Sequence, residues 1–285
     1  MSLLVITADD FGLSPEVNAA VECAHRDGVL TAASLMVSGA AAQQAVDLAR
    51  KLPSLRVGLH LVLLEGRPTL RPQQIPDLVG PNGMLRSDMV RLAFDLAGRS
   101  DMRRQLQREI AAQFAAFART GLPLDHVNAH KHFHMHPIVA AQVIEVGRHF
   151  GMRALRVPRE PGHVMAPGCA VLAAQARRAS LVTADAVIGL RWSGKMTRER
   201  VLAAIETAPS AFVEIYSHPA TADRFPGHAR GYRYRDELAA LIDPDVVAAV
   251  RRSRRRTGGY SDVAPARAGL SAAGSPRAET IRSRQ

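Results

Sequence analysis

Short apolar runs alternate with amphipathic stretches along almost all of this 285-residue chain. Runs such as Leu3–Ala8 and Arg56–Leu63 are rich in branched apolar residues, which predicts buried strands. Further strands are predicted at 33–37, 124–128, 154–157, 181–188 and 211–217, and helices at 14–28, 41–51, 102–119, 138–150, 168–179, 198–208 and 244–254. Residues 65–99 are rich in proline and glycine and are predicted to form an irregular insertion.

The first helix has clear start and stop signals. Ser14-Pro15-Glu16 offers a cap, a proline in the first turn and an acidic residue near the helix start, and Gly28 ends the helix. Seven strand–helix units imply an α/β fold, a parallel sheet with helices outside it. An open dinucleotide-binding sheet has a glycine-rich turn after its first strand, whereas this turn is Asp9-Asp10-Phe11-Gly12.

Composition narrows the functional classes. The net charge of +11 suggests a nucleic-acid-binding protein, but nine arginines and two acidic residues after position 250 account for +7, leaving +4 for the rest. Nucleic acid is therefore not the expected partner, although a binding protein using this basic tail remains the non-enzyme alternative. One domain is predicted over residues 1–263, and residues 264–285, rich in Arg, Ala and Ser, are predicted to be disordered.

Cysteine content and the chain start bear on localisation. Two cysteines, Cys23 and Cys169, cannot form a disulfide framework, so a reducing compartment is expected. No window approaches the roughly 20 apolar residues of a membrane span, and the first ten residues lack a signal-peptide pattern. The expected location is therefore cytoplasmic. The Arg-rich tail could also contact the inner face of the membrane peripherally, because arginines are attracted to anionic lipids.

Polar residues of one chemical kind follow four of the predicted strands. Asp9 and Asp10 follow the first strand, His60 ends the third, the histidine-rich segment 126–136 follows the fourth, and His218 ends the last. The carboxyl ends of parallel strands meet at one edge of the sheet. Carboxylates and imidazoles gathered there are typical of a divalent metal site with a bound water.

The histidine-rich segment and the Asp9-Asp10 pair each have a simpler explanation than a metal site. The histidine segment could be a metal-sequestering tract, but in an extended chain the even positions from 126 to 136 share one face and apolar residues occupy the other. That order predicts that at least one of these histidines is a ligand. Asp9 and Asp10 could cap the next helix, but Ser14 already offers that cap, and two adjacent anions favour a neutralising cation.

These residues resemble a known family. The run Ala8–Ser14, the triplet Gly58-Leu59-His60 and the segment His126–Pro137 resemble the YdjC-like carbohydrate deacetylases of the chitooligosaccharide deacetylase type. Residues 28–37, 126–134 and 155–161 are most similar to the hopanoid-biosynthesis-associated branch. The resemblance implies an irregular, TIM-like (β/α) barrel and removal of an acetyl group from an N-acetylglucosaminyl hopanoid.

The resemblance also implies roles for individual residues. Asp10, His60 and His130 would hold one divalent metal, Mg²⁺ or Zn²⁺, and Asp9 would be the general base. The chitooligosaccharide branch has a third histidine and an aspartate where this chain has Lys131 and Asn128. That departure leaves the metal triad intact and weakens the case for a chitin-derived substrate.

The remaining assignments are hypotheses from position. His218, at another strand end, is the candidate general acid, with a structural role as the alternative. Arg156 would orient Asp9 or contact substrate, and His132, His134 and His136 are candidate substrate contacts. The expected substrate is an N-acetylated glycolipid or oligosaccharide, and a homodimer is conceivable. Deacetylation of soluble oligosaccharides, or another hydrolysis by a metal-dependent barrel, is the enzyme alternative.

Overall fold

The computed structural model describes residues 2–163, 166–208 and 211–263. Its sheet is parallel throughout, in the order β4-β3-β2-β1-β6-β5, and β7 pairs with the start of β1. The strands are β1 (Leu3–Phe11), β2 (Ala32–Leu35), β3 (Arg56–Leu61), β4 (Val127–Ala129), β5 (Ala186–Ile188), β6 (Phe212–Ser217) and β7 (Arg256–Thr257). The strands up to β6 are apolar and largely buried, as predicted for a parallel sheet covered by helices.

The segment between residues 153 and 159 connects the two ends of this sheet. Leu155 bridges to Val127 at the start of β4, and Ala154 bridges to Val182 on the other side. Val187 in β5 donates to the Arg159 carbonyl at 2.9 Å. The parallel strands therefore curl into an irregular (β/α) barrel, which confirms the predicted fold class. The regular strand predicted at 154–157 is wrong, because this segment makes only isolated bridges.

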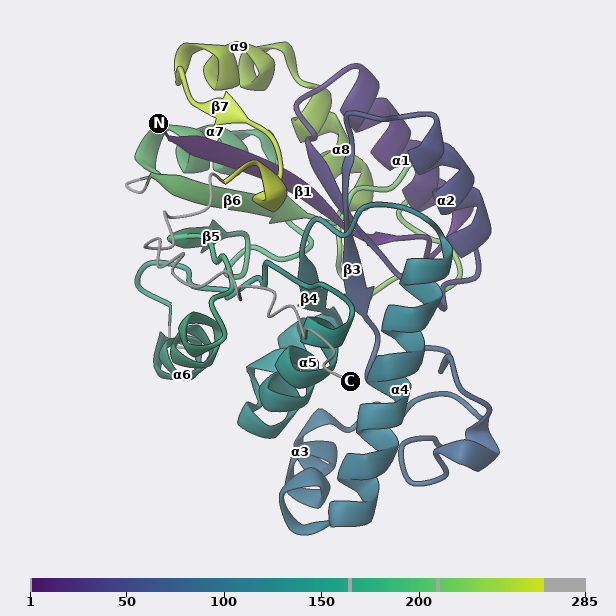
Figure 1. Cartoon of the computed structure of the whole chain (residues 1–285). Helices are drawn as coiled ribbons and strands as arrows, with labels where there is room; N and C mark the ends of the chain where they lie inside the picture. The colour runs from purple at the N-terminus through teal and green to yellow at the C-terminus, as the bar shows by residue number, and fades with distance from the viewer. Residues whose placement is uncertain (1, 164–165, 209–210, 264–285) are drawn as a thin grey trace, which may run out of the picture.

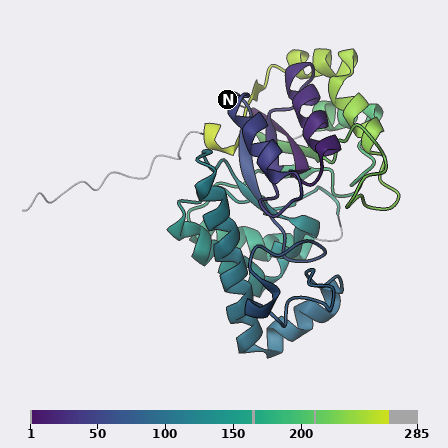
Figure 2. The ribbon, with the colours of Figure 1, turned by 90° about the vertical axis from the view of Figure 1, so that its right-hand side faces the viewer.

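Helices surround the barrel (Figures 1 and 2). They are α1 (Pro15–Arg26), α2 (Ala42–Arg50), α3 (Met89–Gly98), α4 (Ser100–Arg119), α5 (Pro137–His149), α6 (Ala166–Arg178), α7 (Arg198–Thr207), α8 (Tyr234–Ile242) and α9 (Pro244–Arg252), with short 3₁₀ turns at Pro72–Gln74, His130–Met135 and Tyr260–Asp262. The predicted start of α1 is confirmed, since the Ser14 hydroxyl accepts from the Val17 amide at 3.4 Å. No helix in the described ranges is long and apolar enough to cross a membrane.

The insertion after β3 is more ordered than its composition indicates. It contains α3, which lies beside α4 and extends beyond the barrel (Figure 1). Its loop is held by the buried Glu109 of α4, which accepts from the amides of Thr69 at 2.7 Å and Leu70 at 2.9 Å. Leu92 is buried while Phe94 is 75% exposed, so α3 presents one apolar face to the protein and another to solvent. The tail predicted to be disordered, residues 264–285, lies outside the described residues.

Candidate metal centre

The end of β1 departs from a regular strand where its two aspartates lie. Between Ala8 and Phe11, β1 has one more residue than its partner β2, and Asp10 has a φ of 63°. Adjacent side chains of a regular strand point to opposite faces, but a bulge with one left-handed residue redirects one of them. Both carboxylates consequently face His60, Asp9 at 4.0 Å and Asp10 at 3.3 Å. The strained backbone therefore serves the site.

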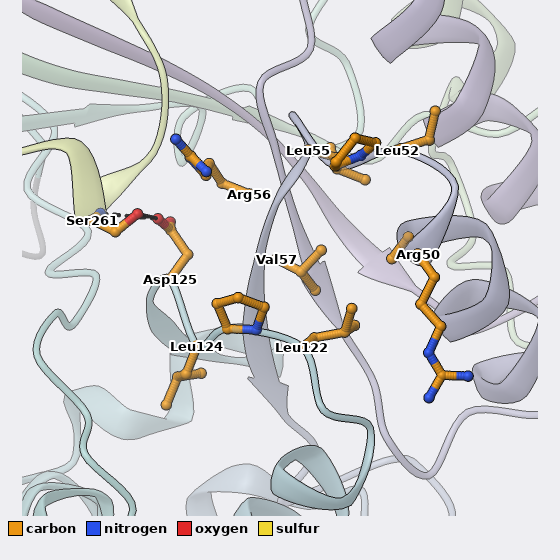
Figure 3. A pocket seen from close by; sticks show the side chains of 12 residues that line it. Arg50, Leu52, Leu55, Arg56, Val57, Leu122, Leu124, Asp125 and Ser261 are labelled. Carbon is orange, nitrogen blue, oxygen red and sulfur yellow. Dashed lines mark hydrogen bonds between the residues drawn. The ribbon is translucent and has the colours of Figure 1, made fainter.

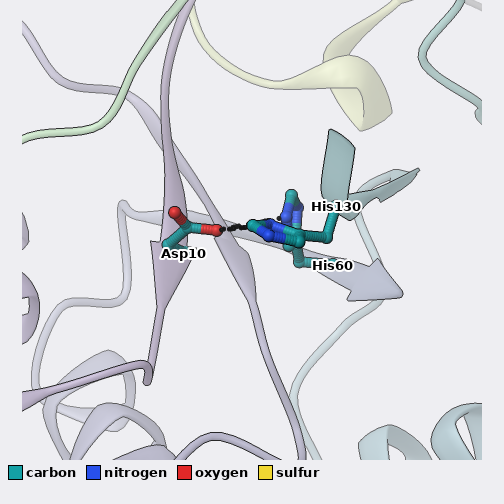
Figure 4. Close-up of side chains that lie close together, drawn as sticks. All are labelled: Asp10, His60 and His130. Carbon is teal, nitrogen blue, oxygen red and sulfur yellow. Dashed lines mark ion pairs between the residues drawn. The ribbon is translucent and has the colours of Figure 1, made fainter. Parts of the chain in front are cut away.

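Three side chains from three strands converge at the carboxyl end of the barrel (Figure 4). Asp10 Oδ1 lies 3.3 Å from His60 Nε2 and 3.3 Å from His130 Nδ1. The ligand atoms of the three residues lie within 4.8 Å of one another. β3 carries His60 near its end and His130 directly follows β4, so strand register positions both imidazoles.

The hydrogen bonding around this cluster fits a cation. Among the described residues, the buried Asp10 Oδ1 accepts no hydrogen bond. His60 Nδ1 lies 2.7 Å from the Asn128 Oδ1, and an amide oxygen only accepts, so the His60 proton belongs on Nδ1. A carboxylate oxygen thus faces an imidazole lone pair, and a divalent cation between them would satisfy both. Burial raises the pKa of Asp10, but His130 and His60 outweigh it and hold the pKa well below its usual value.

Asp9 is bound into a buried charged network behind the cluster. Arg156 Nη1 donates to Asp9 Oδ2 at 2.5 Å, while its Nε and Nη2 donate to Glu214 at 2.9 and 2.7 Å. Thr7 and Tyr260 donate their hydroxyls to Glu214, both at 2.6 Å. Burial raises the pKa of Asp9, but the charge of Arg156 outweighs it and keeps Asp9 ionised. Arg156 is fully buried, so its described contacts favour orientation of Asp9 over direct contact with substrate.

His218 follows β6 at the same end of the barrel. Its ring packs edge-on against Tyr216 and Tyr232, with centroids 5.7 and 5.1 Å away, and its backbone amide donates to Glu237. Its buried Nδ1 has no hydrogen-bond partner among the described residues. The ring is therefore held between two aromatic side chains at the end of the barrel that carries the cluster.

The histidine-rich segment is extended only as far as β4. The expectation that residues 126–136 are extended, with the even positions on one face, is therefore wrong beyond that strand. Lys131 and His132 have φ values of 53° and 54°, which turn the chain into a 3₁₀ turn at the end of the strand. The turn leaves His130 at the metal cluster. His132 and His134 contact other groups instead. His132 Nε2 lies 3.0 Å from the Tyr216 hydroxyl, and His134 Nε2 lies 2.8 Å from the Arg156 carbonyl.

Burial keeps these further histidines neutral. It lowers the pKa of His134 to about 4 and that of His132 well below its usual value, and the charge of Arg156 acts in the same direction on both. His136 is half-buried and begins α5. The ring Nδ1 atoms of all three have no partner among the described residues. Substrate contact by His132, His134 or His136 stays a prediction.

One cavity adjoins the metal cluster, and a separate groove is lined by residues that follow His130. A cavity of about 240 Å³ is lined by His130, Met36 and Glu65. A larger groove of about 760 Å³ lies between α3 and the 3₁₀ turn, with Phe94, Phe133, Met135 and His132 in its wall. A third pocket, of about 280 Å³, is lined by Asp125 and other residues at the opposite, amino end of the strands (Figure 3).

Several buried side chains around Asp9 and His60 have no role that was predicted from the sequence. Glu214 is a charged residue within the apolar run Phe212–Ser217, and a charge in a buried strand is a usable signal of a buried ionic partner. Asn128 was noticed only as a departure from the resembled family. Ser34 and His126 give no comparable signal, because their contacts depend on which strands are neighbours.

Comparisons with known proteins agree with this architecture. The family model described as YdjC-like protein matches residues 3–252. A carbohydrate deacetylase of Brevibacillus brevis is 33% identical over 221 residues, 77% of this chain and 82% of that protein. A carbohydrate deacetylase of Geobacillus stearothermophilus is 32% identical over 247 residues, 86% and 91% of the two chains.

A solved structure shares the fold. It is a candidate cellobiose-phosphate cleavage protein from Enterococcus faecalis V583, with a TM-score of 0.78 and 22% identity. The match covers 92% of this chain and 99% of that one. At this identity the likeness shows the fold alone.

Proposed function

The chain belongs to the YdjC-like family, and we propose that it is a metal-dependent hydrolase that removes the N-acetyl group from an N-acetylglucosamine-type sugar. The observation that carries the proposal is the convergence of Asp10, His60 and His130, with the ionised Asp9 beside them. The related carbohydrate deacetylases of known sequence support the same reaction class.

Each residue of the site has a role in amide hydrolysis. A divalent cation held by Asp10, His60 and His130 would polarise the acetyl carbonyl, acidify a water and stabilise charge on the carbonyl oxygen. Asp9 takes the proton of the attacking water as general base. Arg156 keeps Asp9 ionised and fixes its orientation through the 2.5 Å ion pair. Burial of this pair excludes competing water.

His218 is the proposed general acid for the leaving amine, because it follows β6 at the same end of the barrel as the cluster and its ring is held between Tyr216 and Tyr232. The His218→Gln variant is expected to lose about 100-fold in kcat on an N-acetylated sugar. Hydrolysis of an aryl acetate, whose leaving group needs no proton, should fall much less, and bound metal should be unchanged. Equal loss on both substrates would indicate a structural role and remove the assignment.

The proposed substrate carries its sugar on a hopanoid lipid. The support is the 760 Å³ groove that is lined by Lys131 and His132, the residues directly after His130, and by the exposed apolar residues Val90 and Phe94 of α3. Monomeric soluble proteins rarely expose contiguous apolar surface without a binding role. A polycyclic hydrocarbon placed there would contact the 3₁₀ turn that begins at His130.

Acetate release measured on three substrates tests this function. An N-acetylglucosaminyl hopanoid should be deacetylated, a soluble N-acetylated oligosaccharide more slowly, and a sugar phosphate ester not hydrolysed.

In Phe94→Ser, KM for the lipid should rise about tenfold through lost apolar contact, while the soluble substrate should be unaffected and serves as the control. Faster turnover of the soluble substrate would replace the lipid assignment, and turnover of the ester alone would overturn the deacetylase proposal.

A further inference from the structure

A line of buried polar side chains crosses the barrel and ends at the metal cluster. Asp125, which lines the pocket of Figure 3, has its Oδ2 2.9 Å from His126 Nδ1. His126 Nε2 lies 3.0 Å from Ser34 Oγ, and Ser34 Oγ lies 3.0 Å from Asn128 Nδ2. All four side chains are buried, so unsatisfied donors or acceptors here would be costly.

The proton positions along this line follow from donor and acceptor chemistry. Asp125 also accepts the Ser261 amide at 2.9 Å and the Ser261 hydroxyl at 2.6 Å, as a carboxylate does. His126 must therefore donate from Nδ1, which leaves Nε2 to accept the Ser34 hydroxyl proton. The Ser34 oxygen in turn accepts an N–H of Asn128. Asp125 thus sets the direction of every hydrogen bond as far as Asn128.

The other side of Asn128 imposes the same orientation. Its Nδ2 donates to Asp9 Oδ1 at 3.0 Å, and Asp9 is ion-paired with Arg156. A flipped amide would put an oxygen 3.0 Å from this carboxylate, which would repel it. With both N–H groups committed, the Asn128 Oδ1 must face His60 Nδ1 at 2.7 Å.

A glycine provides the space for this arrangement. A Cβ on Gly58 of β3 would lie 2.5 Å from the His126 ring, closer than real Cβ contacts. Gly58 thus allows the imidazole to pack flat against the strand, two residues before His60. The Gly58-Leu59-His60 triplet therefore contributes both the space for the His126 ring and the proposed metal ligand His60.

We propose that Asn128 is a positioning residue that holds the His60 proton on Nδ1, so that Nε2 keeps the lone pair aimed at Asp10 and His130. The Asp125–His126–Ser34 line and Asp9 orient the Asn128 amide from two sides. Without this amide, the His60 proton would move to Nε2 and bond to Asp10 Oδ1, 3.3 Å away, and that tautomer cannot bind a metal. The inference rests on the proposed function only in taking the cluster as a metal site.

The tautomer can be measured directly in metal-free protein. Long-range ¹H–¹⁵N correlation spectra of ¹⁵N-histidine-labelled wild type should show His60 protonated on Nδ1. In Asn128→Leu the His60 proton should appear on Nε2, and Co²⁺ affinity should fall roughly 10- to 100-fold. These readouts do not involve the sugar substrate, so failure to release acetate would count against the proposed function and leave this result standing.

A conservative variant separates positioning from packing. Asn128→Asp still offers His60 an acceptor oxygen, so the Nδ1–H tautomer and Co²⁺ affinity should be kept within a few-fold. Asn18→Leu is the matched control, since Asn18 is equally buried but bonds to Gly12 and Gln44. Its His60 tautomer should match wild type.

Two results would overturn the proposal. One is an unchanged Nδ1–H tautomer with unchanged Co²⁺ affinity in folded Asn128→Leu. The other is an Nε2–H tautomer in Asn128→Asp, and this outcome decides the question even if Asn128→Leu does not fold.

Discussion

The Asp9→Asn variant is expected to retain its metal and lose 100-fold or more in kcat for acetate release. An asparagine cannot accept the proton of the attacking water, and general-base catalysis typically supplies a factor of 10²–10⁴. The substitution also leaves Arg156 paired with Glu214 alone. None of the proposed metal ligands is replaced, and the new side-chain oxygen can still accept from Asn128 Nδ2, as Asp9 Oδ1 does at 3.0 Å, so elemental analysis should give the wild-type metal content.

Asp47→Asn provides the matched control for this variant. Asp47 is an exposed carboxylate of α2 that accepts from Gln43 and pairs with Arg50 at 3.3 Å. Its loss should leave both kcat and metal content unchanged. An Asp9→Asn enzyme with full activity would exclude Asp9 as the base, and loss of metal from that variant would make Asp9 a ligand instead.

Removal of the metal is expected to abolish acetate release, and so is His130→Ala. Within the described part of the chain the cluster supplies three ligands, so deletion of one imidazole should lower metal affinity enough for dialysis to empty the site. His130 is the more informative position, because its side chain is 24% exposed against 3% for His60, so truncation disturbs the core less. Metal per protein, measured by elemental analysis, is the readout.

Restoring activity to the chelated enzyme identifies the metal. Two imidazoles and a carboxylate suit Zn²⁺, Fe²⁺, Co²⁺ or Ni²⁺ by ligand type, whereas Mg²⁺ prefers oxygen ligands, so each ion is tested in turn. His149→Ala, which removes an exposed histidine of α5 that bonds to the Glu145 carbonyl, should keep wild-type metal. Full activity after complete chelation would contradict the metal-dependent mechanism.

Local patterns predicted most of the secondary structure. The start of α1 follows from Ser14-Pro15-Glu16, and the apolar runs of β1, β3 and β6 were recognisable because both faces of these strands are buried. Helix α3 was missed because glycine and proline dominate the segment before it, although its own residues 89–98 form helix. The strand predicted at 154–157 is reduced to bridges, since its pairing depends on barrel closure.

The chemistry of the site was recognisable from residue type and position at strand ends, because parallel strands bring their carboxyl ends to one edge. That reasoning brought Asp9, Asp10, His60, the histidine-rich segment and His218 to one edge, and the family resemblance singled out Asp10, His60 and His130 as the ligands. Which way each side chain points depends on the left-handed backbone at Asp10 and Lys131, and local propensity does not predict positive φ at either residue. The tertiary structure alone decided that Asn128 lies between Asp9 and His60, because that contact requires the β3–β4 register and barrel curvature together.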